Sequence, residues 1–196
     1  MKDHLTTRDE KRIESDAKIL RATIEVIANK GYTNANIREI ANVAGVTSGL
    51  ITQRFSTKEK LLIHAIYSTH TVWMDHSIPD DLNVEILLRG IIKELLRVYD
   101  RDETVFKFLQ VISSSTDIPL NVTYKQRDFF IGSGINKVMT EAQKEGRLLE
   151  GNTAVLYNIF FCNTIRLIAD FKRAWLDVPD EEFFLSLISR KKDEVE

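Results

Sequence analysis

The chain is 196 residues long, with 43% hydrophobic and 29% charged residues, a composition that is ordinary for a globular protein and excludes a disordered or fibrous chain. Its 8 Gly and 3 Pro are too few for an all-β or loop-rich fold, so the composition predicts a mostly helical protein. The net charge of −2 is unevenly spread. Residues 1–60 carry 11 Lys and Arg against 8 Asp and Glu, so the N-terminal third is the better candidate for contact with nucleic acid.

The first helix is predicted over about residues 13–30. Its apolar side chains are spaced by three and four residues, which places them on one face. They are Ile13, Ala17, Leu20, Ile24 and Ile27. Gly31 is expected to end this helix, because glycine enters the left-handed conformation at little cost.

Two short helices are predicted next. The second helix begins at the cap residue Asn36, with Glu39 in the position of a capping box, and ends at Gly45. The third runs from the cap residue Thr47 to about Phe55.

The remaining two-thirds of the chain also has helical periodicity. A second capping box at residues 56–59 is expected to begin a long fourth helix that ends before Pro79. Its buried side chains are predicted to be Leu62, Ala65, Ile66, Thr69 and Trp73. Further helices are predicted at about residues 84–98, 105–112, 120–145 and 152–174, and from Pro179 onward. The segment Gly132-Ser133-Gly134 is expected to bend or weaken the helix over residues 120–145.

Residues 37–55, IREIANVAGVTSGLITQRF, have the spacing of a helix-turn-helix. Ala41 is small enough to let two helices approach, and Gly45 permits the tight turn between them. Val46 fills the corner and Ile51 anchors the second helix to the core, which leaves that helix able to enter a major groove. A helical hairpin that binds no DNA would have the same pattern, and this alternative stays open.

The stretch from Lys18 to Leu62 resembles the DNA-binding domain of the tetracycline-repressor (TetR) family of bacterial regulators. The residues that carry the resemblance are Ile19-Leu20-Arg21-Ala22, Gly31-Tyr32, Ile37, Ile40-Ala41, Ala44-Gly45-Val46-Thr47, Gly49, Phe55 and Lys58-Glu59-Lys60-Leu61. The resemblance implies an all-α homodimer of about nine helices. It places a three-helix helix-turn-helix DNA-binding domain at residues 1–56 and a helical effector-binding and dimerisation domain at residues 57–196.

Three positions in the third helix depart from the usual pattern of that family. Thr52 stands where an aromatic residue is common, Arg54 stands where His is common, and Leu50 suits a thymine methyl better than a polar base edge. The residues expected to contact base edges or nearby phosphates are Thr47, Ser48, Gly49 and Gln53, of which Gln53 is the best base reader. The expected phosphate contacts are Asn36, Thr52, Arg54 and Lys58. A basic arm with Arg8, Lys11 and Arg12 could reach a neighbouring minor groove.

The C-terminal two-thirds is predicted to hold the dimer interface and a ligand pocket. The helix over residues 152–174 is apolar on more than one side, and the family implies a homodimer through the last two helices, with an ordinary core as the alternative. Candidate pocket residues are Tyr67, Trp73, Phe106, Gln110, Phe129 and Asn163, each of which could equally belong to the core. No cofactor and no metal is expected, because His64, His70 and His76 turn to different helix faces.

These features predict a ligand-responsive transcriptional regulator, most simply a repressor, that binds a palindromic double-stranded DNA operator and is released by an unknown small-molecule effector. An activator of the same fold is an alternative, because the sign of regulation depends on where the operator lies. A helical enzyme or a protein-interaction module is a further alternative. The enzyme is disfavoured, because the chain has no nucleophile elbow, P-loop, dinucleotide fingerprint or HExxH motif.

We expect a cytoplasmic protein that does not enter a membrane. The N-terminus is polar and lacks the apolar core of a secretory signal, and the single Cys162 fits a reducing compartment. The longest stretch without charged residues, 151–165, has 15 residues, whereas a membrane span takes about 20.

Overall fold

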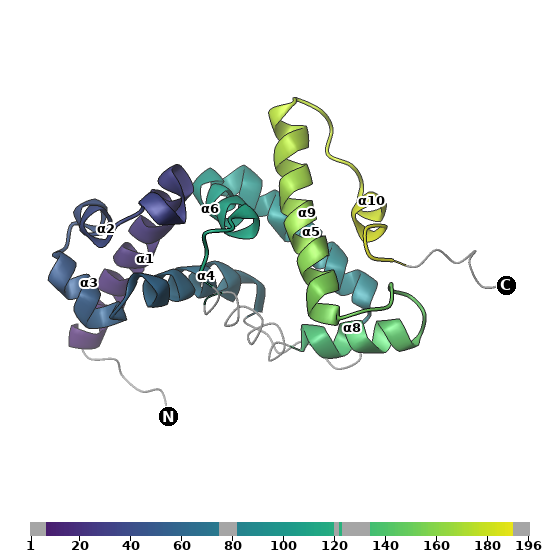
Figure 1. Ribbon diagram of the computed structural model, residues 1–196, viewed down its shortest axis with the longest axis horizontal. Coiled ribbons are helices and arrows are strands. Elements are labelled where there is room, and N and C mark those ends of the chain that lie inside the picture. Colours follow the sequence, from purple (N-terminus) through teal and green to yellow (C-terminus); the bar gives the residue numbers. More distant parts are fainter. Residues whose placement is uncertain (1–6, 75–81, 120–121, 123–133, 190–196) are drawn as a thin grey trace.

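We describe the protein from a computed structural model, which covers residues 7–74, 82–119, 122 and 134–189. Within these residues the regular structure is helical, apart from one antiparallel bridge between Leu148 and Ser189. The helices are α1 (Thr7–Asn34), α2 (Ile37–Ala44), α3 (Ser48–Phe55), α4 (Lys58–Met74), α5 (Val84–Arg101), α6 (Glu103–Ser114), α8 (Ile135–Lys144), α9 (Thr153–Arg173) and α10 (Glu181–Leu185). The predicted all-α fold is therefore confirmed. In Figure 1 the head, defined as α1–α3, lies at one end, α8–α10 lie at the other, and α4 and α6 lie between them.

The head has the predicted helix caps. The Glu39 N–H donates to Asn36 Oδ1 at 2.9 Å, and the Leu50 N–H donates to Thr47 Oγ1 at 3.2 Å. Between the two capped helices Gly45 has φ 68°, a left-handed conformation that glycine adopts at little cost. The two caps and the Gly45 turn fix where α2 begins and ends and where α3 begins.

A small apolar core joins the three helices of the head. Ala41 of α2 and Ile51 of α3 are almost completely buried, as the helix-turn-helix spacing predicts. Ile19 of α1 and Phe55 of α3 belong to the same cluster of buried side chains. The turn is therefore held by packing as well as by its backbone.

α1 differs from the prediction at its start. It begins at Thr7, so the basic arm is helical. At the predicted end, Gly31 breaks the helix with φ 76°, and one further helical turn follows the break. Ile13 is 55% exposed and Ala17 is exposed as well, so these two residues were wrongly assigned to the apolar face. The buried face of α1 begins at Ile19, where the other helices of the head reach it.

The start of α4 is also one residue away from the prediction. Ser56 has φ 66° and ends α3, with its N–H donating to the Thr52 carbonyl at 2.9 Å. The cap is Thr57 instead, whose Oγ1 accepts the Lys60 N–H at 3.2 Å. A residue that terminates one helix in a left-handed conformation is not placed to begin the next.

The head is joined to the rest of the protein mainly along α1 and α6, which form the most extensive helix pair, while α4 contacts α1 and α3. Two polar contacts lie at the ends of this pair. Arg21 donates to both carboxylate oxygens of Asp102, at 2.6 and 3.1 Å. Thr33 Oγ1 donates to Asp117 Oδ2 at 3.1 Å. Asp102 precedes α6 and Asp117 follows it, and their partners come in the same order along α1. α1 and α6 therefore run in the same direction, with one contact at each end of α6.

Asp102 alone forms the corner between α5 and α6. Its N–H donates to the Val98 carbonyl at 2.9 Å, and its Oδ1 accepts the Val105 N–H at 3.1 Å. Burial raises the pKa of the Asp102 carboxyl, but the hydrogen bonds from Arg21 and Val105 outweigh it, so the pKa lies below its ordinary value. The same residue thus ends α5 with its backbone N–H, and with its side chain it caps α6 and binds α1.

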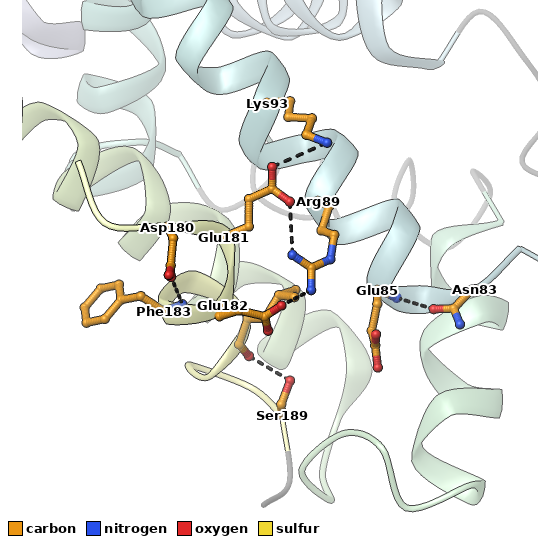
Figure 2. Close-up of polar contacts among 10 residues, drawn as sticks. Asn83, Glu85, Arg89, Lys93, Asp180, Glu181, Glu182, Phe183 and Ser189 are labelled. Carbon is orange, nitrogen blue, oxygen red and sulfur yellow. Dashed lines mark hydrogen bonds and ion pairs between the residues drawn. The ribbon is translucent and has the colours of Figure 1, made fainter. Parts of the chain in front are cut away.

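The C-terminal end is built around α5, α9 and α10. Leu88 of α5, Phe160 of α9 and Phe184 of α10 are fully buried in the same core. Figure 2 shows how charges fasten α10 to α5: Arg89 donates to Glu181 at 3.0 Å and also contacts Glu182.

Gly134 interrupts the helix predicted over residues 120–145, as expected for the segment Gly132-Ser133-Gly134: it has φ 82°, and α8 begins immediately after it at Ile135. The structure does not describe residues 120–121 and 123–133. α10 has five residues, with Asp180 as its cap, whereas the predicted helix was longer because Leu187 and Ile188 continue the apolar pattern. Ile188 is buried without being helical.

α9 is long and apolar enough, by length and composition, to cross a membrane. One such helix is weak evidence for a membrane span, so the expectation of a chain that does not enter a membrane is not overturned. About a third of its apolar stretch is buried within this chain, and the core helices of soluble proteins pass the same test.

Candidate nucleic-acid interface

α3 presents one face to the core and the opposite face to solvent. Ile51 and Phe55 are buried, whereas Gly49, Thr52 and Gln53 are exposed. Residues three and four apart share a helix face, so the exposed residues form one polar stripe. The predicted base reader Gln53 lies in this stripe, and Thr47 is exposed at the start of the helix.

Among the described residues, no close contact requires a glycine at position 49. A Cβ atom placed there would meet only Thr47 Oγ1, at 3.9 Å, which is an ordinary van der Waals distance. An alanine would therefore fit the fold. The missing side chain leaves the backbone of α3 open to close approach from outside.

The hydroxyl and amide groups predicted to contact phosphates already have roles in the head. Asn36 and Thr47 use their side-chain oxygens as helix caps, which leaves the Asn36 amide group as a donor. Thr52 Oγ1 donates to the Ser48 carbonyl at 3.1 Å, so its hydroxyl hydrogen is used within α3. Ser48 itself is half-buried.

Lys58 is anchored to the end of α1. Its Nζ lies 4.2 Å from the centre of the Tyr32 ring and donates to the Thr33 carbonyl at 3.4 Å. Partial burial lowers the pKa of Lys58, against the opposing effect of Glu59. Burial and the Glu59 carboxylate raise the pKa of Tyr32 to about 12, and the Tyr32 hydroxyl donates to Glu59 at 3.3 Å. The lysine is thus held at the boundary between head and α4.

Arg54 lies at the edge of the exposed stripe and reaches back to α1. Its Nη1 is 3.4 Å from Asp16 Oδ2, and the Nε of Arg12 is 3.9 Å from the same oxygen. The side chains of Arg54 and Asp16 are 24% and 29% exposed. Asp16 was not predicted from the sequence, because it lies 38 residues from Arg54 and no local pattern links the two.

The structure describes the side chains of four of the six candidate pocket residues, and these lie on α4, α6 and α9. Phe106 is buried on α6 with its ring edge against Tyr99, and Gln110, one turn further along, is half-buried. Tyr67 is half-buried on α4. Asn163 is exposed on α9, where its Nδ2 donates to the Ile159 carbonyl. Trp73 belongs to α4, but its side chain and the whole of Phe129 lie outside the described residues.

The outward face of α9 and α10 differs in character from that of α3. Val155 is 56% exposed, Ile159 is 42% exposed, and Phe183 of α10 is exposed to the same extent as Ile159. Trp175 and Leu176, in the turn after α9, are exposed as well. Among the described residues these helices therefore carry an apolar surface that the chain itself leaves uncovered.

The described residues contain no group of three or more His, Cys, Asp and Glu side chains placed to hold a metal ion. His64, one of the three histidines considered for such a site, has its ring edge against Phe55, with 5.4 Å between the ring centres.

Comparison with known proteins gives a family match for the N-terminal part of the chain. Residues 19–65 match the family described as "Bacterial regulatory proteins, tetR family". No curated protein matches the chain by sequence.

Solved structures share the fold over nearly the whole chain. A TetR-family transcription regulator from Marinobacter aquaeolei VT8 matches with a TM-score of 0.71 and 15% identity, over 93% of this chain and 100% of that one. A TetR-family transcriptional regulator from Haemophilus influenzae RD matches with a TM-score of 0.64 and 19% identity, over 92% and 99% of the two chains. The fatty acid degradation regulator FadR from Bacillus halodurans matches with a TM-score of 0.60 and 21% identity, over 86% and 97%. Residues 19–65 thus match the tetR family model, and the chain as a whole shares the fold of solved TetR-family regulators.

Proposed function

We propose that the protein is a ligand-responsive transcriptional repressor that binds a palindromic DNA operator as a homodimer and is released by a small-molecule effector. One observation carries this proposal: α3, the second helix of a capped and packed helix-turn-helix, turns a polar stripe to solvent with Gln53 at its centre. Such a helix can enter a major groove and read base edges there.

The DNA contacts are proposed to come from α3 and the residues around it. The residues expected at base edges or nearby phosphates are Thr47, Ser48, Gly49 and Gln53. Those expected at phosphates are Asn36, Thr52, Arg54 and Lys58. The Thr52 hydroxyl is uncharged, and its hydrogen is used inside α3. Arg54 and Lys58 would therefore supply most of the charge that attracts the phosphate backbone.

The apolar surface of α9 and α10 supports a homodimer. Large exposed apolar patches are uncommon on monomeric soluble proteins and are typical of protein interfaces. A second copy that covers Val155, Ile159 and Phe183 would bury this surface. It would also bring two α3 helices into one complex, and two helices about 34–36 Å apart reach successive major grooves of B-DNA.

The effector site is proposed to lie in the helical domain at residues 57–196, with the DNA-binding domain at residues 1–56. Its candidate residues are Tyr67, Trp73, Phe106, Gln110, Phe129 and Asn163. An effector releases DNA only if it binds the released state more tightly than the DNA-bound state. α4 runs from the head into this domain, and α1 is fastened along α6. A ligand that shifts either helix would therefore move the heads relative to each other.

The same proposal makes the protein a cytoplasmic DNA-binding regulator and not an enzyme. α9 is then an apolar core and interface helix, and it does not span a membrane. An activator of the same fold remains the second candidate, because the position of the operator relative to the promoter decides the sign of regulation.

The test is selection of bound fragments from a pool of random or genomic DNA, at an ionic strength of about 0.15 M, because weaker salt favours non-specific phosphate binding. Recovery of a palindrome, with half-sites about one helical turn apart, is the expected result. Recovery of sequences with no common element would contradict operator recognition. A reporter gene placed behind the recovered site then separates repression from activation.

A further inference from the structure

Asp16 lies between two arginines that belong to different helices. Arg54 comes from the last turn of α3, and Arg12 lies one turn before Asp16 on α1. The same oxygen, Asp16 Oδ2, faces Arg54 Nη1 at 3.4 Å and Arg12 Nε at 3.9 Å. One carboxylate therefore gathers two guanidinium groups at the side of the recognition helix.

The contacts of the Asp16 carboxylate contribute little to the stability of the fold. The other oxygen, Asp16 Oδ1, is buried and accepts no hydrogen bond from any described residue. A buried polar atom without a partner costs free energy, and a single contact at 3.4 Å recovers little of it. A role in stabilising the fold does not explain why a carboxylate lies here.

The Asp16 carboxylate instead offsets the repulsion between the two arginines and orders their side chains. Two guanidinium groups repel each other, and a free arginine side chain loses considerable rotamer entropy when it becomes ordered on a ligand. Arg54 has five N–H donors, of which one is directed at Asp16. The remaining donors can bind a phosphate while Asp16 still holds the side chain in place.

We propose that Asp16 is a positioning residue for DNA binding, which holds Arg54 and Arg12 together as one phosphate-binding pair beside α3. The inference rests on the proposed function, since it assigns a role within DNA binding. It adds Arg12 to the contacts, as a partner of Arg54 on the same phosphate.

The proposal predicts an effect of opposite sign to simple electrostatics. Asp16 is a negative charge close to a polyanion, so its loss should strengthen DNA binding if charge alone mattered. If Asp16 positions the arginines, its loss weakens binding. Glu14 is the matched control: it lies on the same helix, pairs with Lys18 at 2.7 Å, and has no contact with Arg54 among the described side chains.

The experiment measures the affinity of the full-length chain for a fluorescein-labelled duplex of random sequence, over a series of salt concentrations. Phosphate contacts do not depend on base sequence, so the operator need not be known. Asp16→Asn is expected to weaken binding about three- to tenfold and to lower the salt slope by about one, the value for one lost phosphate contact. Asp16→Glu should restore part of the affinity, and Glu14→Gln should leave it unchanged or slightly raised.

A double-mutant cycle separates positioning from a general effect on the fold. In a background that carries both Arg12→Ala and Arg54→Ala, Asp16→Asn should cause little further loss, because both groups that it positions are gone. A full additional loss would overturn the proposal, as would an Asp16→Asn variant that binds as tightly as the natural chain. If the natural chain binds no duplex at low salt, the proposed function fails together with this inference. If the natural chain binds and Asp16→Asn is neutral, only the inference fails.

Discussion

Two helices at opposite ends of the molecule turn a face away from its core, and the two faces differ in chemistry. The outward stripe of α3 is polar, with Thr52 and Gln53, whereas the outward face of α9 carries Val155 and Ile159. A polar stripe beside cations suits a hydrated polyanion, and an apolar face suits a second protein surface. The difference matches the proposed function, in which α3 meets DNA and α9 meets a second copy of the chain.

The largest effect is expected at the apolar face. Ile159→Asp would bury an unpaired charge in the proposed dimer interface, and it should weaken dimerisation about a hundredfold or more. Sedimentation velocity over a range of protein concentrations measures this. Ile13→Asp is the control, because Ile13 is also exposed but lies on α1. A dimer that survives the Ile159 change would place the interface elsewhere.

At the polar face, simultaneous Gln53→Ala and Arg54→Ala should abolish selection of a specific DNA sequence and weaken binding about thirtyfold or more, because a base reader and a phosphate contact are lost together. The dimer should remain intact. Fragment selection with both proteins tests this, with Lys144→Ala on α8 as a control for loss of one exposed cation. If the double variant selected the same sequence, the contact assignment would be wrong.

Gly49→Ala should change stability and DNA affinity in opposite directions. An alanine fits the structure and favours the helix, so the free energy of unfolding should rise by about 0.5–1 kcal/mol. The added methyl group would lie in the polar stripe and should weaken DNA binding about tenfold. Urea unfolding and a DNA titration of the same variant measure both. A loss of stability would show that Gly49 serves the fold.

The smallest effect concerns the link between the two ends. Asp102→Ala removes a helix cap and the Arg21 pair, and it should lower the free energy of unfolding by about 1 kcal/mol. Asp102→Asn keeps a cap acceptor and should cost less.

The pH dependence of this change follows from the pKa. Asp102 has a lowered pKa in the folded protein, so the ionised carboxylate stabilises the fold above its ordinary pKa of about 3.8. That contribution is lost as the pH falls through the lowered value. Urea unfolding at pH 7, 5 and 3 should therefore show a constant difference between the natural chain and Asp102→Asn at the two higher values and a smaller one at pH 3. A difference that grew toward low pH would contradict this reading of Asp102.

Local chemistry made the head predictable from the sequence. The Asn36 cap, the Gly45 turn and the Thr47 cap each act over three or four residues, so they can be recognised without knowing the fold. The same holds for the starts of α5 and α9, where Asn83 and Asn152 act as caps.

Features that depend on distant contacts were not predictable. Ile13 continues the apolar spacing of α1, yet its side chain is 55% exposed. The contact between Asp16 and Arg54 joins residues 38 positions apart. Asn163 lies on a helix that is apolar nearly all round, and periodicity alone cannot show which side of such a helix faces outward.

The one-residue corner at Asp102 has a mechanical consequence. A residue contributes two soft backbone dihedrals, and here the hydrogen bonds on either side constrain both of them. The joint between α5 and α6 therefore has almost no degrees of freedom of its own. Arg21 also joins α1 to Asp102. A rotation of α6 that keeps these bonds would therefore move α5 and the head together with it.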